Sequence, residues 1–269
     1  MGTAGIPNST PRKRTIDGIK RVKELGLDAM EIEFVRGVRM KKEAAIEVNK
    51  IATELGIVLT VHAPYYVNLN SHDRAKLEAS INRVIESMRI GYVASAWSVT
   101  FHPGYYGGDV PTKAYARVRN SLKKIVEVAK NEGIDIWIRP ELMGSLSEFG
   151  SLEEVISLSK EFENVLPCID FAHLHARARG KFNTYDEFKD ILIYIEKELG
   201  REALDNMHIH ISGIEYGDKG EIKHLNLNQS DFNYKDLAKA LKEFKVKGVL
   251  ISESPNLEED ALLMKRELE

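Results

Sequence analysis

The sequence predicts an α/β fold in which strands and helices alternate to close a single barrel over residues 1–269. Short apolar runs alternate eight times with amphipathic segments, and no long linker or low-complexity tract interrupts them. A chain of 269 residues suits one large α/β domain. Acids and histidines recur where the apolar runs end, and (β/α)8 barrels place their chemistry at those ends. We therefore expect a (β/α)8 TIM barrel with its site at the C-terminal ends of the strands.

The expected strands are short apolar runs, often β-branched, as parallel strands buried on both faces should be. Each is followed by a segment long enough to cross over to the next parallel strand. They cover residues 2–5, 29–34, 57–62, 98–102, 135–140, 165–170, 207–212 and 248–253.

The expected helices carry apolar residues every three to four positions, as in Leu122, Ile125 and Ala129. Ser151 and Thr184 are typical N-caps, and several helices end at a glycine. An open doubly wound sheet is the alternative, but no Gly-rich phosphate-binding fingerprint follows the first strand. The helices cover residues 15–25, 41–55, 73–94, 112–132, 151–162, 184–199, 234–244 and 257–268.

Composition limits the classes of function. The net charge of −3 argues against binding nucleic acid by bulk charge, although a local positive field is compatible with it. The chain has no apolar run of 18 residues and no signal-peptide pattern, so we expect a cytoplasmic protein with no membrane contact. The lone cysteine, Cys168, excludes an internal disulfide and is expected to be a buried, inert thiol. Nothing requires an oligomer.

The residues at the strand ends are of the types that bind divalent metals. Neutral imidazole and carboxylate are the ligands that Zn²⁺ prefers. A lone histidine at a strand end is more often a core residue, but two of them closely followed by proline favour ligands, and buried carboxylates need partners. His208 should point to the same face as His210, one layer deeper, and be structural. The candidate ligands are His62, His102, Glu141, Asp170, His173, His210 and Glu253.

The number of metals predicts the class of substrate. The carboxylates Glu141, Asp170 and Glu253 bring about −3, whereas two divalent cations bring about +4 and three bring about +6. A site with two or three metals is therefore positive and suits a phosphate ester. A site with one metal stays at about −1 and suits a neutral polyol.

Short motifs around these residues follow one another along the chain: His62-Ala63-Pro64-Tyr65, His102-Pro103-Gly104, Pro140-Glu141, Cys168-Ile169-Asp170 with His173, then His210, His224 and Glu253-Ser254-Pro255. Each motif is weak alone, but together they cover essentially the whole chain. They resemble the endonuclease IV family of apurinic/apyrimidinic endonucleases, within the xylose isomerase-like barrels. The resemblance implies hydrolysis of DNA 5′ to an abasic site, a step of base excision repair.

The resemblance also implies a trinuclear zinc site, in which Glu141 is the catalytic carboxylate that bridges two metals. Such a cluster can ionise a water and stabilise charge on the phosphate and on the departing 3′ oxygen. The three implied ligand groups are His62, His102 and Glu141; Asp170, His210 and Glu253; and His173 and His224.

DNA contacts are implied at the barrel rim. Tyr65 and Tyr66 match a loop that enters the minor groove, where an aromatic ring can stack at the missing base; packing on the rim is the alternative. Basic residues that could contact phosphates, or simply be solvated, follow the second and sixth strands: Arg36, Arg39, Lys41, Lys42, Arg177, Arg179 and Lys181.

One position departs from the family. Two residues before His224 the family has an aspartate that binds the third zinc, and this chain has Ile222. Glu221 is one residue further away, and in an extended strand residues three apart point to opposite sides. Unless the loop at 213–223 bends enough to bring in Glu221 or another acid, we expect two firmly held Zn²⁺ ions and a third that is weak or absent, with Mn²⁺ as a possible replacement.

Three hypotheses stay open. The first is a metal-dependent phosphodiesterase that acts on DNA with abasic sites. The second is a mononuclear sugar isomerase or epimerase on the same superfamily barrel, which would leave three histidines unexplained. The third is a non-catalytic nucleic-acid-binding relative, against which the intact carboxylates argue. The second hypothesis needs only Glu141, Asp170, His210 and Glu253.

Overall fold

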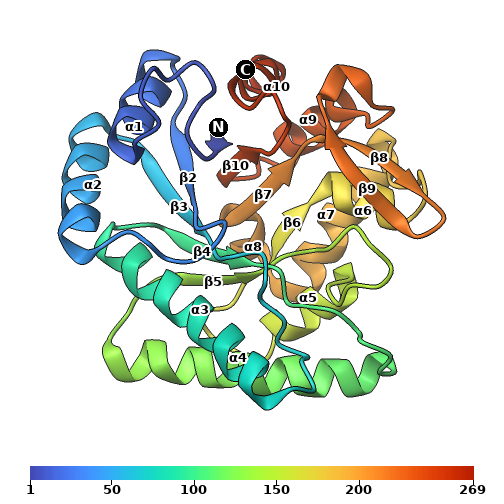
Figure 1. Ribbon diagram of the computed structural model, residues 1–269. Coiled ribbons are helices and arrows are strands. Elements are labelled where there is room, and N and C mark those ends of the chain that lie inside the picture. Colours follow the sequence, from blue (N-terminus) through green and yellow to red (C-terminus); the bar gives the residue numbers. More distant parts are fainter.

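The computed structural model describes residues 1–269 and confirms the barrel. Eight parallel strands form one sheet in the order β5-β4-β3-β2-β1-β10-β7-β6, and the helices surround it (Figure 1). The two outermost strands of this order meet through the isolated parallel bridges Ile138–Val165 and Glu141–Cys168, so the barrel is nearly closed. The strands are β1 (Gly2–Ala4), β2 (Ala29–Glu33), β3 (Val58–His62), β4 (Ser98–Phe101), β5 (Trp137–Pro140), β6 (Cys168–Asp170), β7 (Met207–Ile211) and β10 (Gly248–Ser252).

The parallel register brings the strand ends to one level. Glu33 at the end of β2 pairs with His62 at the end of β3. Across the barrel, Asp170 of β6 pairs with His210 of β7. Polar residues that are far apart in the sequence therefore share one end of the barrel.

The helices begin and end largely where the sequence predicts. Ser151 and Thr184 each form a capping box, with Glu154 and Glu187 respectively. Gly133 ends α4 with a φ of 64°, a left-handed conformation that glycine adopts without strain. The helices are α1 (Thr15–Glu24), α2 (Lys42–Leu55), α3 (Arg74–Val93), α4 (Pro111–Glu132), α5 (Leu152–Ser159), α6 (Phe171–Arg177), α7 (Tyr185–Leu199), α8 (Arg201–Asp205), α9 (Tyr234–Glu243), α10 (Glu258–Leu268) and the short 3-10 helix η1 (Leu227–Gln229).

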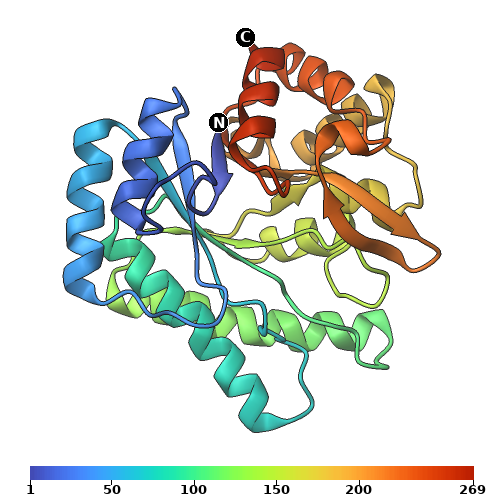
Figure 2. The same cartoon turned by 45° about the horizontal axis from the view of Figure 1, so that its top comes forward.

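Five short elements were not expected from the sequence: helices α6 and α8, the 3-10 helix η1, and strands β8 and β9. Helix α6 follows β6 directly and is capped by Asp170, which accepts a hydrogen bond from the backbone N–H of His173 (2.7 Å). Helix α8 is a single short turn before β7. The segment expected to be a loop at 213–223 is mostly an antiparallel hairpin of β8 (Gly213–Gly217) and β9 (Gly220–Leu225), which projects from the barrel (Figure 2). Such short elements carry too few residues to show a clear period.

A buried arginine occupies the end of the barrel opposite the site, where the strands begin. Arg139 on β5 stacks on Trp97, with its guanidinium 4.5 Å from the ring centroid, and donates hydrogen bonds to the carbonyls of Pro167 and Asn206. Cys168 is fully buried, as expected, and burial raises the pKa of its thiol to about 12. None of the helices combines the length and the apolar character needed to span a membrane.

Candidate metal centre

The structure brings all eight sequence-predicted ligands together at the C-terminal ends of the strands. They form three overlapping groups, in each of which the potential ligand atoms lie within 4.8 Å of one another. The first group is His62, His102 and Glu141; the second is Glu141, Asp170, His210 and Glu253; the third is Asp170, His173, His224 and Glu253.

Glu141 lies at the middle of these groups, immediately after β5, and is fully buried. Its Oε2 is 3.1 Å from His62 Nε2 and 3.4 Å from His102 Nε2. Its Oε1 is 3.4 Å from His210 Nδ1 and 3.4 Å from His173 Nδ1. The two oxygens of one carboxylate therefore face two different sets of ligands, which is the arrangement that a bridging carboxylate needs.

Backbone carbonyls select the tautomers of several histidines. His62 Nδ1 lies 2.7 Å from the carbonyl of Ala63, and His173 Nδ1 lies 2.9 Å from the carbonyl of Leu142. A carbonyl can only accept, so each Nδ1 carries a hydrogen, and in the neutral imidazole each Nε2 presents a lone pair to the centre. His173 Nε2 and His224 Nε2 are only 3.1 Å apart, a distance at which two lone pairs repel, so a proton or a metal cation has to lie between them.

Buried polar atoms without hydrogen bonds test whether these residues fit metals. Glu141 Oε1, Asp170 Oδ2 and His210 Nδ1 are buried and have no hydrogen-bond partner. Such atoms destabilise a fold unless something compensates for the lost water. All three belong to the group of Glu141, Asp170, His210 and Glu253, and a bound divalent cation would compensate for them. The residues therefore fit a divalent-metal site.

Without metals, the buried acids and imidazoles shift one another's pKa values. Burial lowers the pKa of His62, but its hydrogen bond to Glu141 and the charge of Glu33 raise it more, to about 10. Burial raises the pKa of Asp170 to about 6. Protons therefore occupy part of the metal-free cluster at neutral pH, and metals would have to displace them.

Glu31, a fully buried acid on β2, is not among the site residues that the sequence predicts. Its Oε1 lies 2.9 Å from His210 Nε2, an ion-pair contact that is not aligned as a hydrogen bond, and its Oε2 lies 3.2 Å from His208 Nε2. Thr60 donates a hydrogen bond to the same Oε2 (2.8 Å). His208 also contacts Ser98 Oγ at 3.0 Å and lies below His210, as expected. The sequence does contain a signal for this residue, because two acids, Glu31 and Glu33, interrupt the otherwise apolar strand Ala29–Glu33.

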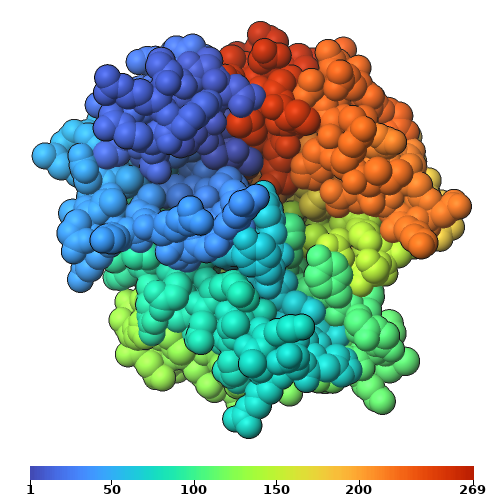
Figure 3. All heavy atoms as spheres, viewed as in Figure 1, coloured from blue at the N-terminus to red at the C-terminus, as the bar shows by residue number.

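The centre opens into a cavity of about 360 Å³ at the barrel mouth. Glu33, Tyr65 and Glu148 are among its lining residues. Tyr65 is 48% exposed, and its ring centroid lies 5.8 Å from that of His102, while Tyr66 is 51% exposed beside Arg83. Neither tyrosine is buried on the rim. The loop after β3 (cyan) and the β8–β9 hairpin (orange) border this face (Figure 3).

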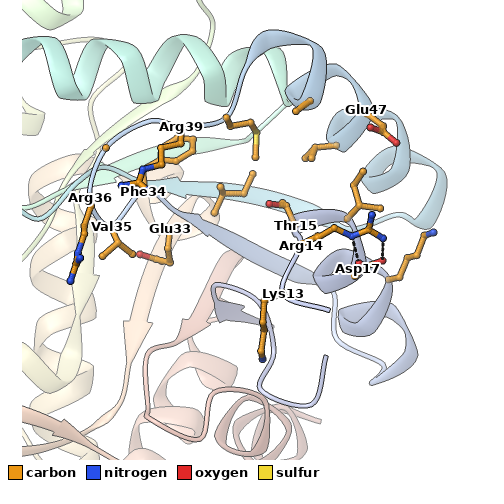
Figure 4. Close-up of a pocket in the computed structure, with 17 residues that line it drawn as sticks. Lys13, Arg14, Thr15, Asp17, Glu33, Phe34, Val35, Arg36, Arg39 and Glu47 are labelled. Carbon is orange, nitrogen blue, oxygen red and sulfur yellow. Dashed lines mark hydrogen bonds and ion pairs between the residues drawn. The ribbon is translucent and has the colours of Figure 1, made fainter. Parts of the chain in front are cut away.

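The basic residues fall into two sets. Arg36 and Arg39 are exposed and line a separate cavity of about 840 Å³ between α1 and the segment after β2, where Arg36 lies on the opposite side from the Arg14–Asp17 ion pair (Figure 4). Arg177, by contrast, is already engaged. It donates hydrogen bonds to the carbonyls of Ser145 (2.6 Å) and Glu148 (3.1 Å), so part of its guanidinium is committed to the protein itself.

The hairpin overturns one expectation. Glu221 was expected to point away from His224, but its Oε1 lies 3.4 Å from His224 Nε2 and its Oε2 lies 3.3 Å from His173 Nε2. Strand β9 is irregular: Lys223 pairs with Glu215, and the next pair joins Glu221 to Tyr216. Ile222 is thus left unpaired, and this bulge reverses the side to which Glu221 points. Ile222 itself is 60% exposed.

The chain is similar in sequence to several known proteins. It is 42% identical over 265 residues to uncharacterized protein MJ0133 of Methanocaldococcus jannaschii, covering 98% of this chain and 94% of that protein. It is 24% identical over 204 residues to probable endonuclease 4 of Mycoplasma pneumoniae, covering 74% of this chain and 68% of the relative.

Solved structures share the fold. Endonuclease IV from Thermus thermophilus matches with a TM-score of 0.76 at 18% identity, over 99% of this chain and 98% of that one. A D-tagatose 3-epimerase-like protein matches with a TM-score of 0.73, also at 18% identity, over 99% and 95%. A family profile described as xylose isomerase-like TIM barrel matches residues 19–269. This chain therefore belongs to AP endonuclease family 2, the family of xylose isomerase-like TIM barrels, as a divergent member related to endonuclease IV.

Proposed function

We propose that this protein is a zinc-dependent phosphodiesterase that cuts DNA 5′ to abasic sites. The observation that carries the proposal is the position of Glu141, whose Oε2 faces His62 and His102 and whose Oε1 faces His210 Nδ1. A mononuclear centre has no use for the first pair of histidines. The relative named probable endonuclease 4 and the Thermus endonuclease IV structure support the same class of reaction.

The residues of the centre would have different roles in hydrolysis. Bound divalent metals would lower the pKa of a water and stabilise negative charge on the phosphate. Glu141 would hold two of them, with His62 and His102 on one side and the group Asp170, His210 and Glu253 on the other. With two metals and the three carboxylates of these groups the centre is positive by about one charge, which attracts a phosphodiester. Tyr65 lies beside the ligands at the mouth of the barrel and would contact the deoxyribose of the abasic site or the base opposite that site.

A DNA-binding surface would extend from this mouth. Tyr66 is exposed beside Tyr65 and can stack on a base without losing core contacts. Arg36 and Arg39 are exposed and form no ion pair, so they are free to bind backbone phosphates. A net charge of −3 makes such local basic groups necessary for binding.

A mononuclear sugar epimerase is the second candidate. Glu141, Asp170, His210 and Glu253 form a four-ligand group by themselves, and the D-tagatose 3-epimerase-like structure shares the fold. That function would leave His62 and His102 facing Glu141 without a role.

Metal analysis and two activity assays separate the candidates. We expect at least two zinc ions per chain, nicking of a duplex with one tetrahydrofuran abasic analogue, and no epimerisation of a ketohexose. Replacing a residue that hydrogen-bonds to a metal ligand typically costs roughly 10–100-fold in activity. Glu141→Gln changes a proposed ligand itself, so it should reduce the nicking rate by more than that. Glu215→Gln, an exposed hairpin acid paired with Lys223, is the matched control. One metal per chain with epimerase activity would refute the phosphodiesterase, as would a Glu141→Gln rate within threefold of the unmodified protein.

A further inference from the structure

We propose that Glu221 is a metal ligand and that it completes, with His173 and His224, a third divalent-cation site. This inference rests on the proposed function only in assuming that the centre holds divalent metals. The Glu221 carboxylate spans both imidazoles, with one oxygen 3.3 Å from His173 Nε2 and the other 3.4 Å from His224 Nε2. The two Nε2 atoms are 3.1 Å apart.

The tautomers of both histidines make this cluster a receptor for a cation. His173 Nδ1 faces the carbonyl of Leu142 at 2.9 Å, and His224 Nδ1 faces the carbonyl of Glu253 at 3.3 Å. In the neutral imidazoles both Nε2 atoms therefore offer lone pairs, and Glu221 adds the negative charge that two neutral ligands lack. Three protein ligands meet the usual minimum for a zinc site.

The bulge at Ile222 explains how an acid at position 221 reaches the site. In a regular strand, residues three apart point to opposite faces. The extra residue in β9 shifts the alternation by one, so Glu221 and His224 point to the same side while Ile222 faces solvent.

Two glycines make room for this arrangement. A Cβ on Gly144 would lie 2.6 Å from Glu221 Oε2 and 3.1 Å from His173 Cδ2. Gly220 has a φ of +89°, and a Cβ there would lie 2.2 Å from the carbonyl oxygen of Gly144. The backbone N–H of Glu221 donates to that same carbonyl (3.1 Å). The loop after β5 thus holds the hairpin where Glu221 faces the histidines.

The test counts metals in the full chain. Zinc-loaded protein is dialysed against a weak chelator, and zinc per chain is measured by plasma mass spectrometry, with circular dichroism as the folding control. We expect three zinc ions in the unmodified protein and two in Glu221→Gln, with the affinity for the third lowered roughly tenfold or more. Gly144→Ala, which displaces Glu221 without removing a ligand, should also weaken the third ion.

Ile222→Asp is the decisive control. Because position 222 faces solvent, this change should leave the count at three, and it should not restore the third ion when combined with Glu221→Gln. Two ions in the unmodified protein, an unchanged count in Glu221→Gln, or restoration by Ile222→Asp would each overturn the proposal. Three zinc ions per chain without nicking would contradict the proposed function and leave the proposed third site supported. Nicking with only two zinc ions per chain would support the proposed function and contradict the third site.

Discussion

One buried carboxylate outside the ligand groups, that of Glu31, orients a histidine of this centre. Glu31 contacts both His208 and His210 and is held by the hydroxyl of Thr60, although it belongs to none of the proposed ligand groups around Glu141. A carboxylate behind a ligand histidine fixes the ring and raises its basicity. Glu31 is therefore a positioning residue for His210, whose Nδ1 faces the metal-binding side.

Glu31→Gln should lower zinc affinity roughly 10–100-fold, because the amide keeps the volume but loses the charge that orients His210. Competition with a chromophoric chelator measures this affinity. Thr60→Val, which removes only the hydroxyl that holds Glu31, should have a smaller effect. An affinity unchanged in Glu31→Gln would show that His210 is positioned by its other neighbours.

Tyr66→Ala should weaken binding to an abasic duplex by about 1–3 kcal/mol, the usual contribution of one stacked aromatic side chain. The ring is exposed, so its loss should not unfold the barrel. Fluorescence anisotropy with abasic and intact duplexes measures the difference, with Tyr92→Ala as an exposed control on α3. Equal losses on both duplexes would mean that Tyr66 does not recognise the missing base.

At the scale of elements, the loop after β5 connects the centre to the hairpin. Arg177, the last residue of α6, donates hydrogen bonds to three carbonyls of this loop, those of Met143, Ser145 and Glu148. Leu146 donates its backbone N–H to the carbonyl of Lys219 at the hairpin tip. A chain of contacts thus runs from α6 through the loop to β9.

Arg177→Leu should destabilise the fold by about 1–3 kcal/mol, because it leaves these loop carbonyls without their charged donor. Urea unfolding gives the change in the free energy of unfolding, and Lys181→Ala serves as the exposed basic control. The variant should also hold its third zinc ion less firmly, since the loop positions Glu221. A stability equal to that of the unmodified protein would show that water replaces the guanidinium without cost.

At the scale of the whole molecule, metals and protons compete for one buried cluster. In the metal-free fold the pKa of His62 is raised from 6.5 to about 10, so protonation of His62 stabilises the fold fully below pH 6.5. That contribution is lost as pH rises through about 10. Burial raises the pKa of the Glu33 carboxyl from 4.5 to about 8, so ionising this carboxyl costs the fold stability as pH rises from 4.5 to about 8.

Metal-free protein should therefore unfold at lower urea concentration at pH 9 than at pH 6.5, and zinc-loaded protein should change less. Zinc uptake at pH 7 should release protons, and zinc affinity should fall as pH is lowered. Urea titrations at the two pH values and a pH-indicator assay of proton release check both expectations. A metal-free protein that gains stability at pH 9 would contradict them.

The sequence by itself determined the barrel and the composition of its site. Long amphipathic helices and apolar strands have clear periods, and capping residues such as Ser151 and Thr184 locate their ends locally. Because every parallel strand of a barrel ends on the same side, His62 and Asp170 could be placed together although 108 residues separate them, from 62 to 170.

Only the tertiary structure decided which further acids join that site and how they are held. Glu31 acquires its role from His208 and His210 on a strand across the barrel, a contact that local pattern does not encode. Glu221 faces the histidines because of one bulged residue at Ile222, and a shift of one residue reverses every side chain of a strand. Arg177 is committed to loop carbonyls by the close approach of α6. Sequence periodicity gives the average geometry of an element, whereas bulges and cross-barrel contacts arise only when the elements pack.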